Sequence, residues 1–324
     1  MNMYRLLLLS VCVCASLAGQ VTTGGVQGRV LDSSGAVVPG VELELSNVDT
    51  YVMSRAASSE AGIYIFNLVP PGNYTLRARF ANFKTSEIKG LVVETGRNTV
   101  VDVTIQPGDV SQSVEVTAAI ENIDTQSASV RANVASRIIV ALPLNSRNPL
   151  AFGQLAPGVD MSGSTANVSG SRRQQNSFYL DGAENSNVQQ NSALQMPNID
   201  AIAEVQVATN SNTAEFGKQP GGYFNVITRS GSNELHGSGF YFFRNLNLNA
   251  NSWRRNRSGL ARPPEEEKMT GGTVGGPAIR DRMFFFGSFQ HYRDQSSSTS
   301  STIRYPTARM LAGDFSEYTG TLYN

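Results

Sequence analysis

The stretch Ala201–Asn245, AIAEVQVATNSNTAEFGKQPGGYFNVITRSGSNELHGSGFYFFRN, decides the fold. It begins with two short apolar patterns, Ile202–Ala208 and Gly222–Thr228, and glycines punctuate the segment between them. A turn of Ser, Gly and Asn follows at residues 230–233, before a third pattern, Glu234–Phe243, that ends in four aromatic residues. Short runs of this kind, bounded by Gly, Ser and Asn, indicate β-strands. The centre of the chain is therefore predicted to be β-sheet.

The composition extends this prediction to the whole chain. Its 324 residues leave room for two or three domains. The 26 basic and 26 acidic residues cancel, whereas a nucleic-acid-binding protein would normally show a basic excess or a basic face. Glycine is frequent, at 30 residues, and runs with helical periodicity are scarce. We therefore expect a mainly β protein without a nucleic-acid partner.

The first 19 residues read as an export signal. Arg5 supplies a positive charge, and the apolar run Leu6–Ala18 has the length of a signal peptide and is too short for a membrane-spanning helix. Both cysteines, Cys12 and Cys14, lie in this segment, so the exported chain is expected to use neither a disulfide nor a thiolate.

The sequence offers little for catalysis. It has two histidines, His236 and His291, and neither stands in a spacing typical of metal ligands. No nucleophile, base and metal-ligand set converges in the sequence. We therefore expect a protein that is not an enzyme and has no cofactor and no metal. No later segment has the 18 or so apolar residues of a spanning helix, so entry into a membrane would require a barrel.

Residues 20–106 are predicted to form a small β-sandwich. Apolar residues alternate with polar ones in about seven short runs, and turn signals separate the runs. The run Tyr74–Phe80 is typical, because every second residue is apolar. A connector at 107–120 follows, in which Val114, Glu115, Val116, Thr117 and Ala118 return to the same alternation.

Residues 121–230 are predicted to form a second domain. The helical spacing of Val130, Val134 and Ile138 predicts a short helix over Ser127–Ile139. Residues 178–182, FYLDG, read as a strand that ends in an Asp-Gly turn.

Residues 231–324 read as the start of a barrel. Glu234–Phe243, Met269–Ile279 and Met283–Arg293 have roughly the length of tilted transmembrane strands. The connections between them are long, short and long, as in outer-membrane barrels with long outer loops and short inner turns. This order predicts that Asn245–Lys268 and Asp294–Asn324 face outward and that the turn at Asp281 faces the periplasm.

The amino-acid sequences of these segments resemble those of a known family. The residues AEFG and GGYFNVITRSGSNELHGS, at 214–217 and 221–238, resemble the end of the plug and the first barrel strand of TonB-dependent outer-membrane receptors, in particular the Oar-like branch. GRVLD at 28–32 and PGNYTL at 71–76 resemble the carboxypeptidase-regulatory-like domain. The resemblance implies a transthyretin-like or carbohydrate-binding-like sandwich, an α+β plug and the first strands of a transmembrane β-barrel.

The resemblance also implies a function. Such a receptor binds a solute outside the cell and is energised through TonB and its inner-membrane complex, while its barrel contacts outer-membrane lipid. The chain is expected in the outer membrane, with sandwich and plug on the periplasmic side. The solute is unknown, and a carbohydrate is one candidate. Val114–Ala118 resembles the TonB box, the strand that pairs with TonB. A last sandwich strand or the first plug strand is an equal alternative for this segment.

The plug resemblance singles out further residues. Arg172, Arg173, Asp181 and Asn185 are candidates for plug loops that meet the solute. The two arginines could instead line the barrel wall or be solvated loop residues. Residues 231–324 have room for about three strands, far fewer than the ~22 of such transporters, so the chain is expected to be an incomplete receptor. The alternative function is a secreted or surface module that binds carbohydrate or protein, with a non-functional plug remnant.

Overall fold

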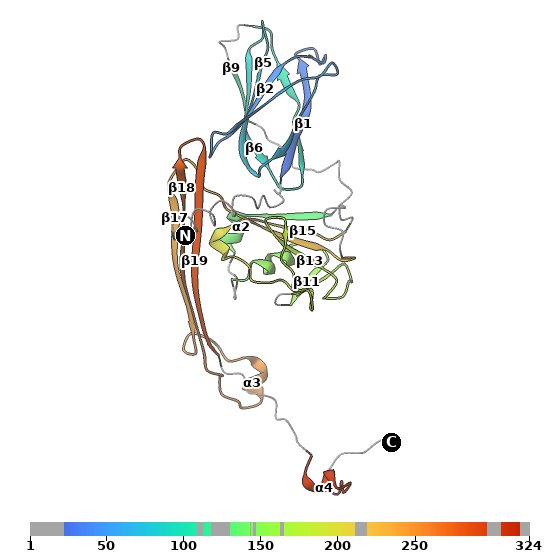
Figure 1. Cartoon of the computed structure of the whole chain (residues 1–324), viewed down its shortest axis with the longest axis vertical. Helices are drawn as coiled ribbons and strands as arrows, with labels where there is room; N and C mark the ends of the chain where they lie inside the picture. The colour runs from blue at the N-terminus through green and yellow to red at the C-terminus, as the bar shows by residue number, and fades with distance from the viewer. Residues whose placement is uncertain are drawn as a thin grey trace, which may run out of the picture. The chain divides into compact units, whose positions relative to one another are not determined.

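The computed structural model describes residues 23–108, 113–117, 130–142, 144, 147–162, 165–210, 219–296 and 306–317. The predicted signal segment and Ala118 lie outside the described residues. Figure 1 shows that strands dominate, which confirms the predicted mainly β fold. The chain divides into two compact units, residues 1–239 with 272–290 and residues 240–271 with 291–324.

The first domain is a β-sandwich of two sheets. In one sheet, β1 pairs antiparallel with β4 and parallel with both β7 and β8. The other sheet has the order β3-β2-β5-β6-β9. The strands are β1 Gly24–Asp32, β2 Glu42–Asn47, β3 Met53–Ala57, β4 Ile63–Val69, β5 Gly72–Arg79, β6 Thr85–Val93, β7 Asn98–Val100, β8 Val103–Ile105 and β9 Ser113–Thr117.

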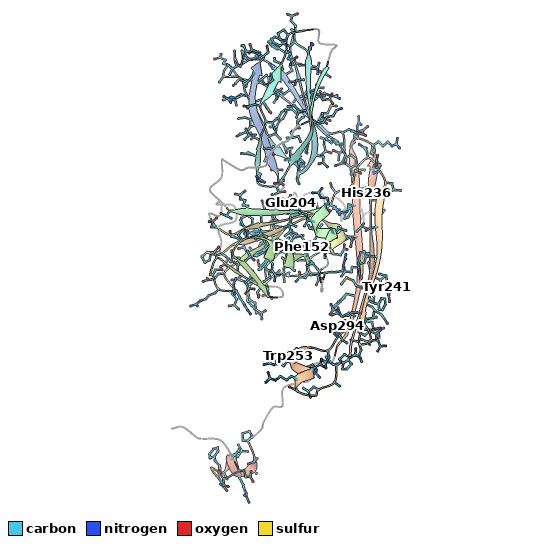
Figure 2. All side chains as sticks on the ribbon, turned by 180° about the vertical axis from the view of Figure 1, so that it is seen from behind. Phe152, Glu204, His236, Tyr241, Trp253 and Asp294 are labelled. Atoms are coloured by element: carbon cyan, nitrogen blue, oxygen red, sulfur yellow. The ribbon has the colours of Figure 1, made fainter. Side chains whose placement is uncertain are left out.

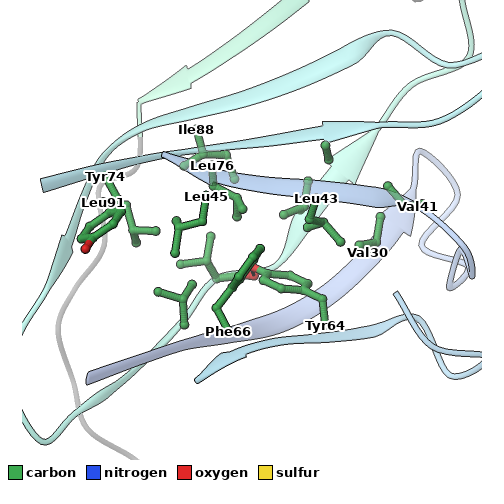
Figure 3. Close-up of a cluster of buried hydrophobic side chains, with 14 of the residues drawn as sticks. Val30, Val41, Leu43, Leu45, Tyr64, Phe66, Tyr74, Leu76, Ile88 and Leu91 are labelled. Carbon is green, nitrogen blue, oxygen red and sulfur yellow. Dashed lines mark hydrogen bonds between the residues drawn. The ribbon is translucent and has the colours of Figure 1, made fainter. Parts of the chain in front are cut away.

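Alternating residues of both sheets fill the sandwich core. Figure 3 shows Leu43 and Leu45 of β2 and Leu76 of β5 in the same cluster as Tyr64 and Phe66 of β4. These side chains are buried because period-two alternation turns every second residue of a strand toward the facing sheet. Burying each such side chain is worth about 1.5–3 kcal/mol.

The backbone of Val101 passes so close to β1 that only glycine fits at position 28. Gly28 of β1 pairs with Tyr64, and a Cβ at position 28 would lie 1.8 Å from the Val101 carbonyl oxygen. The Tyr64 hydroxyl donates to that same oxygen over 2.6 Å. The missing side chain therefore lets the Val101 backbone approach β1 and reach the buried tyrosine.

The second domain is built on a mixed sheet with the order β10-β15-β16-β13-β14. β13 and β16 are parallel, and the other neighbours are antiparallel. β15 and β16 are buried along almost their whole length, so the sheet is covered on both faces. The elements are β10 Arg131–Ala135, α2 Ser136–Ala141, η1 Pro149–Leu155, β11 Val159–Ser162, β12 Thr165–Val168, β13 Ser177–Leu180, β14 Ala183–Glu184, η2 Ile199–Ala201, β15 Ile202–Ala208 and β16 Tyr223–Thr228.

The helix predicted over Ser127–Ile139 is confirmed over residues 136–139 and is wrong over residues 131–135. Residues 131–135 form β10, which pairs with β15 and places Val134 opposite Val205. The helix α2 starts only at Ser136, and it buries Ile139 while Ile138 stays 39% exposed. Backbone pairing with a central buried strand outweighs the weak helical spacing of three apolar residues.

A third sheet has the order β17-β18-β19. Its strands are β17 His236–Asn245, β18 Glu265–Ile279 and β19 Met283–Ser296, and two short helices, α3 Trp253–Arg257 and α4 Ala308–Leu311, lie outside the sheet. The connection between β18 and β19 is a tight turn in which Asp281 has φ 62°. Large apolar side chains stay exposed on these strands, including Tyr241 at 58% and Phe289 at 70%. Exposed aromatic residues of this kind suit a strand that faces lipid.

None of the helices in the described part of the chain is long and apolar enough to cross a membrane.

Candidate functional site: the sandwich edge and the plug

The TonB-box candidate forms the last strand of the sandwich. Val114, Glu115, Val116 and Thr117 lie in β9, which runs parallel to β6 in the register Thr85–Lys89 against Ser113–Thr117. In the described part of the chain β6 is the one strand beside β9, so β9 is the edge of the five-stranded sheet. The segment thus has the geometry of a last sandwich strand, and its role as a TonB box stays a prediction.

A row of charges crosses this sheet toward β9. The register aligns Arg55 of β3, Glu44 of β2, Arg77 of β5 and Glu87 of β6. Arg55 and Glu44 are 3.4 Å apart, and Arg77 and Glu87 are 3.3 Å apart. The alternation ends at β9, where the register sets Glu115 beside Glu87.

The outer face of the same sheet is hollowed. A depression of about 510 Å³ lies over β2, β3 and β5. Its charged lining consists of Glu42, Glu44, Arg55, Arg77 and Arg79. These groups offer donors and acceptors to a polar ligand, which sequence patterning did not foresee because it treats each strand separately.

The plug candidates divide into exposed and structural residues. Arg172 and Arg173 are exposed in the loop before β13. Asp181 instead closes a turn at φ 50°, where its carboxylate accepts from the Thr228 N–H at 2.8 Å and from the Thr228 hydroxyl at 2.9 Å. Asn185 is half-buried and donates to the Gln195 carbonyl at 3.3 Å.

Two further asparagines hold the plug loops, and sequence reasoning missed both. The fully buried Asn176 donates to the carbonyls of Ala166 and Arg173 and accepts from the Gly222 N–H at 2.9 Å. Asn191 donates to the Gln174 carbonyl at 2.9 Å and so ties the arginine loop to the loop after Asn185. No sequence signal marks them, because Asn is common in exposed loops as well.

The turn between β6 and β7 hydrogen-bonds to the plug sheet. The Thr95 N–H donates to a carboxylate oxygen of Glu204 at 3.5 Å, and Gln206 donates to the Thr95 carbonyl at 2.8 Å. Arg131 donates to the Gly96 carbonyl. Gly96 has φ 68°, and a Cβ there would lie 2.8 Å from the Gln206 amide nitrogen.

Among the residues of this contact, Glu204 has a strongly raised carboxyl pKa. Glu204, labelled in Figure 2, lies in β15 and is 7% exposed, and one of its carboxylate oxygens has no hydrogen-bond partner among the described residues. Burial raises the pKa of Glu204 from 4.5 to about 7, with the Glu94 carboxylate adding to the rise and the Thr95 hydrogen bond and Arg97 opposing it. An isolated buried carboxylate favours its neutral form.

A metal centre is not evident in the described part of the chain. No group of three or more His, Cys, Asp or Glu residues there comes close enough to hold a metal ion.

Comparison with known proteins gives two family matches. Residues 25–106 match the carboxypeptidase regulatory-like domain, and residues 227–324 match an outer membrane beta barrel domain. The chain is also 28% identical over 272 residues to the TonB-dependent transporter Oar of Myxococcus xanthus. The resemblance to TonB-dependent outer-membrane receptors is confirmed. The Oar match covers 80% of this chain and 26% of that transporter, so the chain spans about a quarter of the length of its curated relative.

Two solved structures of siderophore receptors are also similar to this chain. PirA from Acinetobacter baumannii is 17% identical with a TM-score of 0.40, and the match covers 50% of this chain and 24% of that protein. PirA from Pseudomonas aeruginosa is 17% identical with a TM-score of 0.39, and the match covers 53% of this chain and 30% of that protein.

Proposed function

We propose that this chain supplies the sandwich, the plug and the first barrel strands of an outer-membrane receptor that takes up a solute with energy delivered through TonB. The similarity to a TonB-dependent transporter over 80% of the chain is the observation that carries the proposal. The exposed aromatic residues of β17–β19 support it, since a lipid-facing strand needs such a surface.

The proposed function is non-catalytic. The protein binds and moves its solute, and its partners are TonB with the inner-membrane energising complex, outer-membrane lipid and the solute. The signal at residues 1–19 exports the chain, and the sandwich and plug face the periplasm. The exposed pair Arg172 and Arg173 favours an anionic or strongly hydrogen-bonding solute at the plug loop.

Two measurements test this function. An antibody against the sandwich should detect the product in the outer-membrane fraction, and recovery in the soluble periplasm alone would refute the membrane location. Uptake of the solute should stop when the TonB gene is deleted. Uptake that continues at the wild-type rate in that strain would refute the energised step.

A second candidate function is recognition of a polar ligand, such as a carbohydrate, by the sandwich. The depression lined by Arg55, Arg77 and Arg79 favours it. A glycan array probed with the full chain should then give hits that weaken in Arg79→Ala. An array without signal, together with intact TonB-dependent uptake, would refute ligand recognition by the sandwich and support the receptor function.

A further inference from the structure

The connection between β17 and β18, residues 246–264, carries four arginines and no acidic residue. We call it the α3 loop, after the short helix within it. The three acids that follow it, at 265–267, each form an ion pair with Arg244 or Lys268, and Arg244 lies 2.7 Å from the first and 3.3 Å from the third. These acids are therefore engaged at the base of the loop, and the positive charge of the loop itself is not cancelled.

Two of the four arginines hold the loop in shape. Arg255 donates two hydrogen bonds to the Ala261 carbonyl, at 3.0 and 2.7 Å. Arg262 donates to the carbonyls of Leu246 and Asn249, both at 2.7 Å. Because these acceptors are neutral, both guanidinium groups keep their full charge. The α3 loop is thus a built structure with a net positive charge.

The other two arginines, Arg254 and Arg257, are exposed on α3. Neither side chain has a hydrogen bond or an ion pair among the residues that the structure describes. The guanidinium carbon of Arg257 lies 5.2 Å from the centre of the Trp253 ring, a cation–π contact. Residues three and four positions apart are neighbours on a helix surface, so both guanidinium groups and the indole ring are close together.

Large apolar side chains are exposed in the same loop. Trp253, labelled in Figure 2, is 72% exposed, Leu248 is 67% exposed and Leu260 is 53% exposed. A dissolved anion would engage the arginines and leave these apolar groups in water. A lipid surface offers anionic phosphates to the arginines and an apolar layer to the tryptophan and the leucines. The combination therefore favours a membrane surface over a small anion.

We propose that the α3 loop binds the phosphate-bearing headgroups of outer-membrane lipid, with Arg254 and Arg257 at the phosphates and Trp253 at the boundary of the apolar layer. This inference rests on the proposed function, since it takes β17–β19 as barrel strands and the loop as their membrane-surface connection. Anchors of this kind set how deep a membrane-spanning segment lies in the bilayer. The loop would do so for β17 and β18.

Tryptophan fluorescence tests the proposal. Trp253 is the single tryptophan of the sequence, so the tryptophan emission of the purified full chain reports on the α3 loop alone. The chain in a neutral detergent is titrated with mixed micelles that contain phosphatidylglycerol, which has an anionic phosphate headgroup. Phosphatidylcholine, whose headgroup has no net charge, and inorganic phosphate are the comparison probes. The emission maximum and the quenching by acrylamide are measured for each probe.

Phosphatidylglycerol should move the emission to shorter wavelength and reduce the quenching, at a lipid fraction on the order of tenfold lower than phosphatidylcholine needs. Equal responses to the two lipids, or no response to either, would overturn the proposal. The same response to inorganic phosphate alone would also overturn it, because the loop would then bind a dissolved anion. TonB-dependent uptake is measured separately, so failure of the lipid contact is distinguishable from failure of the proposed function.

Charge variants give an independent readout. Arg254→Gln should raise the phosphatidylglycerol fraction at half-maximal response about fivefold, which corresponds to about 1 kcal/mol for one charge near an anionic surface. Arg254→Lys keeps the charge and should stay within about twofold of wild type. Arg137→Gln removes the same charge at an exposed position of α2 in the plug and is the matched control. Equal midpoints for Arg254→Gln and Arg137→Gln would contradict the proposal.

Discussion

Glu204 and Thr95 join the plug sheet to the turn between β6 and β7, with the Thr95 N–H donating to the Glu204 carboxylate at 3.5 Å. The carboxylate is buried, and its second oxygen has no hydrogen-bond partner among the described residues. A titratable side chain of the plug sheet therefore takes part in this contact, together with Gln206 and Arg131.

The first prediction concerns pH. The pKa of Glu204 is raised from 4.5 to about 7, so the folded form holds a proton that the unfolded form releases. Its contribution to stability is fully present below pH 4.5 and is lost as the pH rises toward 7, by at most about 3 kcal/mol. Chemical denaturation at a series of pH values should show this loss.

Glu204→Gln should remove most of that pH dependence, because the amide keeps an acceptor and cannot ionise. Glu60→Gln, in an exposed turn, is the control and should leave the profile unchanged. A Glu204→Gln profile that matches wild type between pH 4.5 and 7 would contradict the assignment.

The second prediction concerns the buried loop asparagine. Asn176→Ala removes two donated hydrogen bonds and the two bonds that its side-chain oxygen accepts, from the Gly222 N–H and the Ser171 hydroxyl, at a fully buried site. The variant should lose about 2–4 kcal/mol of stability. Gln190→Ala, at an exposed position in the nearby loop, should cost less than about 0.5 kcal/mol. Equal midpoints in a denaturation series would be inconsistent with this role for Asn176.

The third prediction concerns the sandwich core. Tyr64→Phe deletes the donor to the Val101 carbonyl, which the absence of a side chain at Gly28 brings within reach. A buried acceptor without its donor should lower stability by about 1–3 kcal/mol. Tyr51→Phe changes the same hydroxyl at a 59% exposed site and should have no measurable effect. Thermal unfolding of both variants checks the difference.

The fourth prediction separates binding from stability in the plug. Arg172 and Arg173 are exposed, so replacing both with alanine should change stability by less than about 0.5 kcal/mol. If they contact the solute, as the family resemblance implies, uptake should still fall at least tenfold. Arg147→Ala offers the contrast, since Arg147 forms an ion pair with Asp200 at 2.6 Å and its loss should destabilise the plug. Unchanged uptake in the double variant would leave both arginines as solvated loop residues.

Local patterns predicted much of the fold because the strands have strong period-two alternation. The predicted strand Ile202–Ala208 is β15, residue for residue, and the strand at 222–228 differs from β16 by one residue. The helix prediction failed over residues 131–135, where three apolar residues with helical spacing could not outweigh pairing with β15. Local spacing describes one segment, whereas a strand in a sheet depends on its neighbours.

The sequence by itself determined the order of the segments, the mainly β fold and the resemblance to TonB-dependent receptors, since alternation, turn residues and motifs are local properties. Only the tertiary structure decided that Val114–Thr117 pairs with β6. It also decided that Asp181 accepts hydrogen bonds from Thr228 and that the buried Glu204 accepts one from Thr95. These relationships join residues more than 20 positions apart. They depend on sheet register and packing, and no single stretch of sequence encodes either.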